Sequence, residues 1–401
     1  MPQVFSAGWL YVFLIIMVIS VVRIVLKLRQ IRGGASMDRP LVRLARVERE
    51  KPDLGDGQEA PSELAETDNL IRDGKYSLAI TRLKTMQDGL SPVEDREARG
   101  QVLYRLGACH RRAEAAGVGG LLRAGEALRE AVTLFAPQRF APWRLRALAE
   151  LAGVYEDLSR HRDAAGNAAL AARTFERAGE EAARRGQVSQ ESELRARAGV
   201  AYRRLAVHAD RQANLRKAAD AFEAAASAST GSGDEGAVLA GARMLKMLGD
   251  TSLELAELYQ PKESLKRAME AYGRVLEVVD GRGHPLERGM TLTDLGRAHL
   301  AAYDMAGDNG ELRKAIQYLR DALQLLSGGE VTEHRGRAMA LMADALVRYA
   351  EVKDRRENLQ RSARLYEAAL GMMKDGDRTD ERERVRNRLA EVMERITTGS
   401  G

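Results

Sequence analysis

A three-residue pattern recurs seven times in this chain, and its regular spacing restricts the fold more than any other feature of the sequence. In each copy a small residue is followed four positions later by leucine or an aromatic residue, and three positions after that by a small or apolar residue. Successive copies begin 45, 47, 47, 50, 47 and 47 residues apart. The copies are Ala79/Leu83/Met86, Ala124/Leu128/Ala131, Ala171/Phe175/Ala178, Ala218/Phe222/Ala225, Ala268/Tyr272/Val275, Ala315/Leu319/Ala322 and Ser362/Tyr366/Ala369. Such a period predicts a stacked array of similar units.

A second pattern precedes each copy from the second onward, by 17 residues once and by 19 thereafter. It ends in a small residue and is most often Leu-Gly: Leu106-Gly107, Leu151-Ala152, Ala198-Gly199, Leu248-Gly249, Leu295-Gly296 and Met342-Ala343. Spacings of three, four and seven residues place each three-residue pattern on one helix face. Each unit is therefore predicted to be a helical hairpin in which small residues let the helices approach closely. A single hairpin cannot cover its apolar face, so the units are stable only as a stack.

The loop inside the hairpin also repeats. Four residues before the small residue that opens a copy, the chain carries an amide or hydroxyl side chain: Asn167, Asn214, Ser264 and Asn358. Such side chains commonly accept a hydrogen bond from the first free backbone N–H groups of a helix. We therefore expect these residues to be the N-caps of the second helices.

The order Leu-Gly, then Ala, then Tyr or Phe, then Ala resembles the tetratricopeptide repeat (TPR). Leu295-Gly296, followed by Ala315, Leu319 and Ala322-Leu323, is the plainest unit. The resemblance covers about residues 62–396, although the usual period is about 34 residues. It implies an all-α, right-handed α-solenoid of about seven TPR-like hairpins over residues 62–378. Residues 379–401 are expected to be a charged C-terminal capping helix and tail, because a solenoid end needs a polar cover.

The first 32 residues have the character of a transmembrane anchor. Met1 to Val22 contains no charged side chain, and the apolar pattern gives a span over residues 4–28. About 20 residues at about 1.5 Å each cross a hydrocarbon core of about 30 Å. A cleaved signal peptide would carry its basic residues before the apolar run, whereas here they follow it. The positive flank predicts a single-pass membrane protein with its N-terminus outside and the repeats in the cytoplasm.

Residues 33–61 are expected to be a linker, because several glycines and prolines interrupt any long helix. Within it, residues 40–51 alternate apolar and basic side chains. They could form an amphipathic helix on anionic lipid, near the basic stretch Arg23–Lys51, or a solvated tether. The stretch Arg23–Lys51 holds nine basic and three acidic residues, a net +6 against +5 for the whole chain. The repeats are therefore close to neutral, which argues against nucleic-acid binding.

The sequence contains no recognisable catalytic, cofactor or metal motif. A single cysteine, Cys109, excludes a disulfide framework and a thiolate zinc cluster. The six histidines lack the i, i+4 spacing of a helical metal site. Gly117-Val118-Gly119-Gly120 lacks the Lys-Ser/Thr ending and the preceding strand of a phosphate loop. We therefore predict that the chain is not an enzyme and has no cofactor.

The candidate site is the concave surface, which the first helices line in TPR arrays and which binds peptide segments of partner proteins. Counting positions from the small residue of each unit places nine basic residues on this surface: Arg111, Arg112, Arg203, Arg204, Arg243, Lys246, Arg297, Arg337 and Arg348. The acidic residues at those positions are Glu156, Asp157, Asp250, Glu254 and Asp344. Guanidinium groups suit carboxylate or phosphate ligands. The alternative is that these are ordinary solvated helix charges.

These features together favour a membrane-anchored protein-interaction scaffold or adaptor whose cytoplasmic repeats dock partner proteins. Two other functions stay open. A nucleic-acid-binding solenoid would bind in a salt-sensitive manner. A regulatory sensor subunit would act on an enzyme that is a separate chain.

Overall fold

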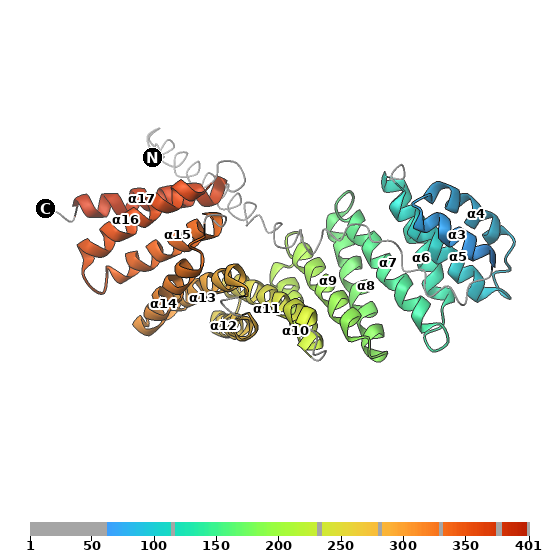
Figure 1. Cartoon of the computed structure of the whole chain (residues 1–401), viewed down its shortest axis with the longest axis horizontal. Coiled ribbons are helices and arrows are strands. Elements are labelled where there is room, and N and C mark those ends of the chain that lie inside the picture. Colours follow the sequence, from blue (N-terminus) through green and yellow to red (C-terminus); the bar gives the residue numbers. More distant parts are fainter. Residues whose placement is uncertain are drawn as a thin grey trace, which may run out of the picture.

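The computed structural model describes residues 62–113, 117–230, 235–279, 283–328, 332–373 and 379–398. These residues form fifteen α-helices and no strand, as the all-α prediction requires (Figure 1). The helices are α3 (Ser62–Arg72), α4 (Tyr76–Asp88), α5 (Arg96–Arg112), α6 (Gly117–Leu134), α7 (Ala141–Leu158), α8 (Ala164–Arg184), α9 (Val188–Ala206), α10 (Arg211–Thr230), α11 (Glu235–Ala256), α12 (Pro261–Val278), α13 (Pro285–Ala306), α14 (Asn309–Leu325), α15 (Thr332–Tyr349), α16 (Arg355–Met372) and α17 (Thr379–Thr398).

The predicted membrane anchor (1–32) and linker (33–61) lie outside the described residues. None of the described helices has both the length and the apolar character that crossing a bilayer requires.

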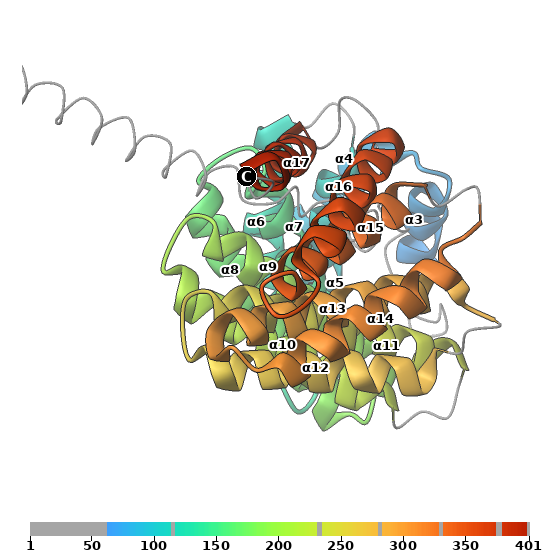
Figure 2. The same ribbon diagram turned by 90° about the vertical axis from the view of Figure 1, so that its left-hand side faces the viewer.

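Consecutive helices pair into seven hairpins, from α3/α4 to α15/α16, and α17 follows the last. The array is bent: α10–α13 lie low in both ribbon views, whereas the α3/α4 and α16/α17 ends lie high (Figures 1 and 2). On the inner side of the bend are the first helices of the hairpins, and some of them also contact each other directly: α5 with α7, α9 with α11, α11 with α13, and α13 with α15. We call the surface formed by first helices α5, α7, α9, α11, α13 and α15 the inner wall.

The repeated patterns meet inside each hairpin. The small residue of the first helix lies against the large residue of the second, so that a Cβ built on Gly249 would be 2.5 Å from Cε1 of Tyr272. Gly107, Gly199 and Gly296 are placed in the same way against Leu128, Phe222 and Leu319. The interval between the two patterns, 19 residues in most units and 17 in that of Gly107, therefore places the small residue of the first helix against the large residue of the second.

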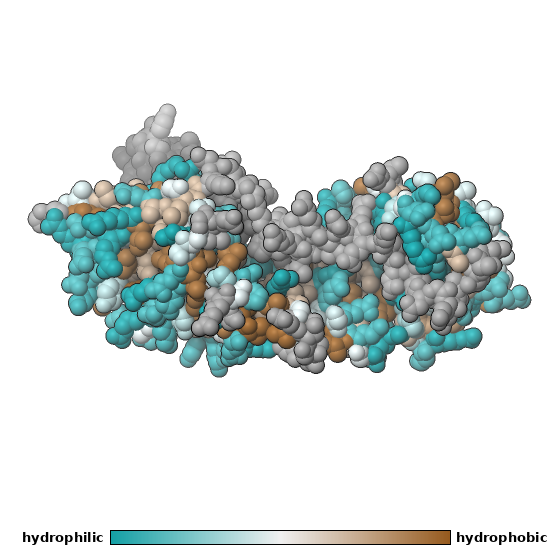
Figure 3. Space-filling model, in the orientation of Figure 1, coloured by the Kyte–Doolittle hydropathy of each residue, from teal (hydrophilic) through white to brown (hydrophobic). Residues whose placement is uncertain are grey.

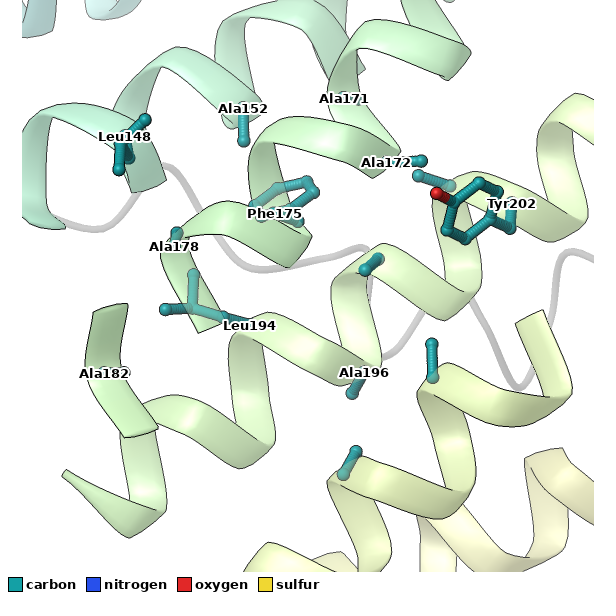
Figure 4. Packing of buried hydrophobic residues seen from close by; sticks show 14 of the residues in the cluster. Leu148, Ala152, Ala171, Ala172, Phe175, Ala178, Ala182, Leu194, Ala196 and Tyr202 are labelled. Carbon is teal, nitrogen blue, oxygen red and sulfur yellow. The ribbon is translucent and has the colours of Figure 1, made fainter. Parts of the chain in front are cut away.

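The large residues also join neighbouring hairpins. Phe175 of α8 is fully buried and lies between Ala152 of α7 and Leu194 of α9, the first helix of the next hairpin (Figure 4). Burying an aromatic ring among aliphatic side chains contributes about 2–3 kcal/mol. Beyond the last hairpin, Val385 and Val392 of α17 are buried together with Tyr366 of α16.

The prediction that asparagine and serine are N-caps is wrong. The residues just before α8, α10, α12 and α16 are instead Asp163, Asp210, Gln260 and Asp354, each with a positive φ between 21° and 49°. Asn214 lies inside the first turn, where its Nδ2 donates to the carbonyl of Ala209 at 2.9 Å. Equivalent bonds run five residues backward from the other three positions, Asn167, Ser264 and Asn358. These side chains donate to a carbonyl of the preceding loop and do not accept from a free N–H of the helix.

Candidate functional site

The nine predicted site residues all lie on first helices. Arg111 and Arg112 are on α5, Arg203 and Arg204 on α9, Arg243 and Lys246 on α11, Arg297 on α13, and Arg337 and Arg348 on α15. Eight of the nine lie within 4 Å of a carboxylate on a neighbouring first helix. The inner wall is therefore a ladder of ion pairs that runs from hairpin to hairpin.

At the N-terminal end of the ladder, α5 is joined to α7. Arg111 contacts Asp157 through Nε at 2.9 Å and Glu150 through Nη1 at 3.1 Å. Arg112 reaches the other oxygen of Glu150 at 2.6 Å. Burial alone would raise the pKa of Glu150, but the two guanidinium groups outweigh burial and lower it. Gly153 on α7 leaves the space through which Arg111 passes.

The adjacent arginines of α9 point toward opposite neighbours. Arg204 approaches Glu156 of α7 at 3.7 Å, and Arg203 approaches Glu254 of α11 at 3.2 Å. Arg211, at the start of α10, contacts the second oxygen of Glu254 at 2.6 Å. Although Arg203 and Arg204 are adjacent in the sequence, the structure divides them between two hairpin junctions.

The densest part of the ladder surrounds Asp294 of α13, which is almost fully buried. Lys246 of α11 contacts Asp294 at 2.6 Å, and Arg297 and Arg337 each approach it at 3.4 Å. Burial would raise the pKa of Asp294, but the three cations outweigh it and hold the pKa well below its usual range. Asp250 belongs to the same group and accepts a hydrogen bond from the Tyr272 hydroxyl at 2.7 Å.

At the far end, Arg348 of α15 forms two 2.6 Å bonds with Asp304 of α13, and these bonds raise the pKa of Arg348. Tyr366 donates to Asp344 at 2.5 Å, the same relation as between Tyr272 and Asp250 two hairpins earlier. Arg243 is exposed and makes no ion pair with the residues that the structure describes.

Sequence reasoning identified only part of the acidic half of the ladder. Glu150, Asp294 and Asp304 were not among the candidate residues, yet they hold six of the nine predicted cations. A signal was present for two of them, since Glu150 and Asp294 each directly precede the Leu-small pair of their unit. Arg105 and Arg197 occupy the same position in other units, and all four side chains are buried or half-buried.

The lone cysteine has no part in this surface. Cys109 is buried in α5, and burial raises the pKa of its thiol to about 12. A thiol with such a pKa stays protonated near neutral pH and is a poor nucleophile.

No family model matches this chain, and no curated protein matches it. It is similar in structure to the C-terminal part of a TPR repeat-containing protein from Cytophaga hutchinsonii, with 11% identity, a TM-score of 0.44, and coverage of 79% of this chain and 98% of that one. It is also similar to BtubC from P. vanneervenii (14%, 0.37, 67% and 92%) and to the apo form of RapI (13%, 0.36, 77% and 96%). The assignment of TPR-like hairpins to this chain rests on its own packing.

Proposed function

We propose that this protein is a membrane-anchored interaction scaffold whose cytoplasmic repeats dock segments of partner proteins on the inner wall. The observation that carries the proposal is the ladder of ion pairs, which spans α5 to α15 and holds charges of both signs in fixed positions. A rigid surface of this kind loses little conformational entropy when a partner binds. The anchor is proposed from the apolar span of residues 4–28 and its basic flank.

The pairing within the wall decides which substitutions are informative. Replacing one member of a pair leaves its partner without a counter-charge and perturbs the junction between hairpins. Arg243 avoids this difficulty, because it shares a helix face with Lys246, Asp250 and Glu254 but is exposed and makes no ion pair with described residues. A second informative change exchanges the two residues of one ion pair, as in Arg348→Asp/Asp304→Arg. The exchange keeps the attraction between α13 and α15 but reverses the local charge pattern.

The test is affinity purification of the full chain from its own membranes, followed by mass spectrometry. We expect one set of co-purified proteins with wild type, which Arg243→Glu and the Arg348/Asp304 exchange each reduce. Arg173→Glu is the matched control, because Arg173 is an exposed arginine on the second helix α8. Equal recovery with all three variants would refute docking on the inner wall.

The anchor and its orientation need a separate test. A tag placed after Gly401 should stay protected when protease is added to intact cells, and it should be cleaved once the membrane is opened. Recovery of the tagged chain in the soluble fraction, or cleavage on intact cells, would contradict the proposed topology.

A further inference from the structure

A groove of about 670 Å³ lies between the last two second helices, α14 and α16, on the opposite side of the hairpins from the ion-pair ladder. Its floor is formed by Met342, Leu346 and Tyr349 of α15. Leu323 of α14 and Leu365 of α16 contribute to its walls. Figure 3 shows hydrophobic residues gathered over α15, between more hydrophilic residues of the two flanking helices. We call this surface the outer groove.

Four arginines line the rim of the outer groove: Arg313 and Arg320 from α14, and Arg361 and Arg364 from α16. All four are exposed, and no acidic residue is among the residues that line the groove. Arg313, Arg320 and Arg364 make no ion pair with any residue in the described part of the chain. Arg361 is 3.9 Å from Glu357, a contact in which both side chains are largely exposed.

The contrast with the inner wall is informative. There, eight of nine basic residues are held by carboxylates of the neighbouring hairpin, so their charges are neutralised within the chain. At the outer groove, positive charges from two helices surround an apolar floor without such neutralisation. Like charges gathered at one site raise the local positive potential, and this favours an anionic ligand.

We propose that the outer groove binds an acidic amphipathic helix of a partner protein. Apolar side chains spaced three and four residues apart would enter the groove, which is the usual way in which a helix occupies an apolar channel. Carboxylates flanking that apolar face would pair with the four arginines, whose planar groups can donate two parallel hydrogen bonds to one carboxylate. The inference rests on the proposed scaffold function and adds to it a second surface with a partner of defined chemistry.

The length of the groove sets the size of the partner segment. Its lining residues on α14 extend from Arg313 to Gln324, eleven residue steps or about 16 Å at about 1.5 Å per residue. This corresponds to about three helical turns, so a segment of about 11 or 12 residues would fill the groove.

The repeats supply a matched control. Arg313 lies two residues before the small residue of its copy, and Arg216 occupies that position in α10. Arg364 lies two residues after the small residue, and Arg173 occupies that position in α8. Arg173 and Arg216 are also exposed. The variant Arg173→Glu/Arg216→Glu therefore makes the same charge change at the same repeat positions, away from the outer groove.

The probe is a phage-displayed library of 12-residue peptides, selected on the full chain in detergent micelles and counter-selected against Arg313→Glu/Arg364→Glu. We expect enriched peptides that carry Asp or Glu beside apolar residues three and four positions apart. The Kd of the most enriched peptide should rise at least tenfold in the Arg313→Glu/Arg364→Glu variant and stay within twofold in the control variant. Unchanged circular dichroism of both variants will show that the helices are intact.

Three results would overturn the inference. The first is the absence of enrichment, and the second is enrichment of basic or uncharged peptides. The third is binding of a soluble anionic lipid, dihexanoyl phosphatidylglycerol, that is lost in Arg313→Glu/Arg364→Glu while no acidic peptide binds. None of these depends on Arg243 or on the Arg348/Asp304 pair, so failure at the outer groove is distinguishable from failure of docking on the inner wall.

Discussion

Arg105 and Asp68 form a doubly hydrogen-bonded ion pair in the interior of the protein, with Nε–Oδ1 and Nη2–Oδ2 distances of 2.6 and 2.9 Å. Both side chains are almost completely buried. The guanidinium group also lies over the Trp143 ring, with Cζ 5.1 Å from its centroid. Because Asp68 is on α3, Arg105 on α5 and Trp143 on α7, this cluster connects the first three hairpins.

Asp68→Asn should loosen the N-terminal end of the array. The substitution keeps the shape but removes the buried carboxylate that accepts two hydrogen bonds from Arg105, and removing one partner of a buried ion pair typically costs about 3–5 kcal/mol. Stability in a repeat array is local, so the effect should be concentrated in α3 and α4. Hydrogen exchange measured by mass spectrometry should show faster exchange there and little change beyond α8. Glu66→Gln, which breaks the exposed contact with Arg82, is the control and should change exchange little.

Gly249→Ala should destabilise the hairpin α11/α12. The new methyl group would lie 2.5 Å from the Tyr272 ring, which is fully buried and held by its bond to Asp250. Overpacking of this kind costs about 1–3 kcal/mol. Gly273→Ala is the matched control, because Gly273 is also helical but has no neighbouring atom within 4 Å of a built Cβ. That change should stabilise helix α12 by about 0.5–1 kcal/mol. Thermal melts of the two variants should therefore shift in opposite directions, and a shared direction would contradict the packing argument.

These two glycines show what sequence can predict about the fold. Gly249 was identified because it recurs with a fixed spacing to Tyr272, and periodicity reports on contacts that every unit makes. The all-α fold and the seven hairpins follow from such contacts. Gly273 belongs to no repeated pattern, and only the structure shows that it has open space around it.

The candidate site was less accessible to sequence reasoning. Register placed Arg203 and Arg348 on the first helices, but it could not identify their partners, because Glu254 and Asp304 lie about one repeat away in the chain. Pairing across a junction depends on how far one hairpin is rotated relative to the next, and no short motif encodes that rotation. The outer groove was missed for the same reason, since Arg313 and Arg364 come together only when α14 and α16 are placed side by side.

Lowering the pH from 7.5 to 5.0 should reduce stability partly through His110. Burial lowers the pKa of His110 from 6.5 to about 4, and the charges of Arg123 and Lys84 act in the same direction. Between about pH 6.5 and 4 the unfolded chain therefore binds a proton that the folded chain does not, so stability falls as pH falls through this window. The decrease in Tm should be smaller in His110→Gln than in wild type. His161→Gln, at an exposed position, should behave like wild type, and an equal decrease in all three proteins would contradict the assignment.

Asp294→Asn should uncouple the C-terminal hairpins. The substitution removes the carboxylate that Lys246, Arg297 and Arg337 share. The three cations then keep only longer contacts, those of Lys246 and Arg297 with Asp250 at 3.4 and 3.8 Å and that of Arg337 with Glu381 at 3.9 Å. Loss of one partner from a buried ionic group costs about 3–5 kcal/mol. The expected result at pH 7 is an earlier unfolding transition, with faster hydrogen exchange in α11, α13 and α15. Asp220→Asn is the control, because Asp220 pairs with Arg267 at an exposed site.

The pH dependence of this effect has a definite sign. The three cations hold the pKa of Asp294 well below its ordinary value of 3.8, so its contribution is complete above that value and is lost as pH falls below it. In wild type, acid therefore removes the stabilisation that Asp294→Asn lacks at every pH. The difference in unfolding free energy between the two proteins should be constant from pH 7 to about pH 5 and should shrink below about pH 4. A difference that stays constant down to pH 3 would show that the charge of Asp294 is not what joins α11, α13 and α15.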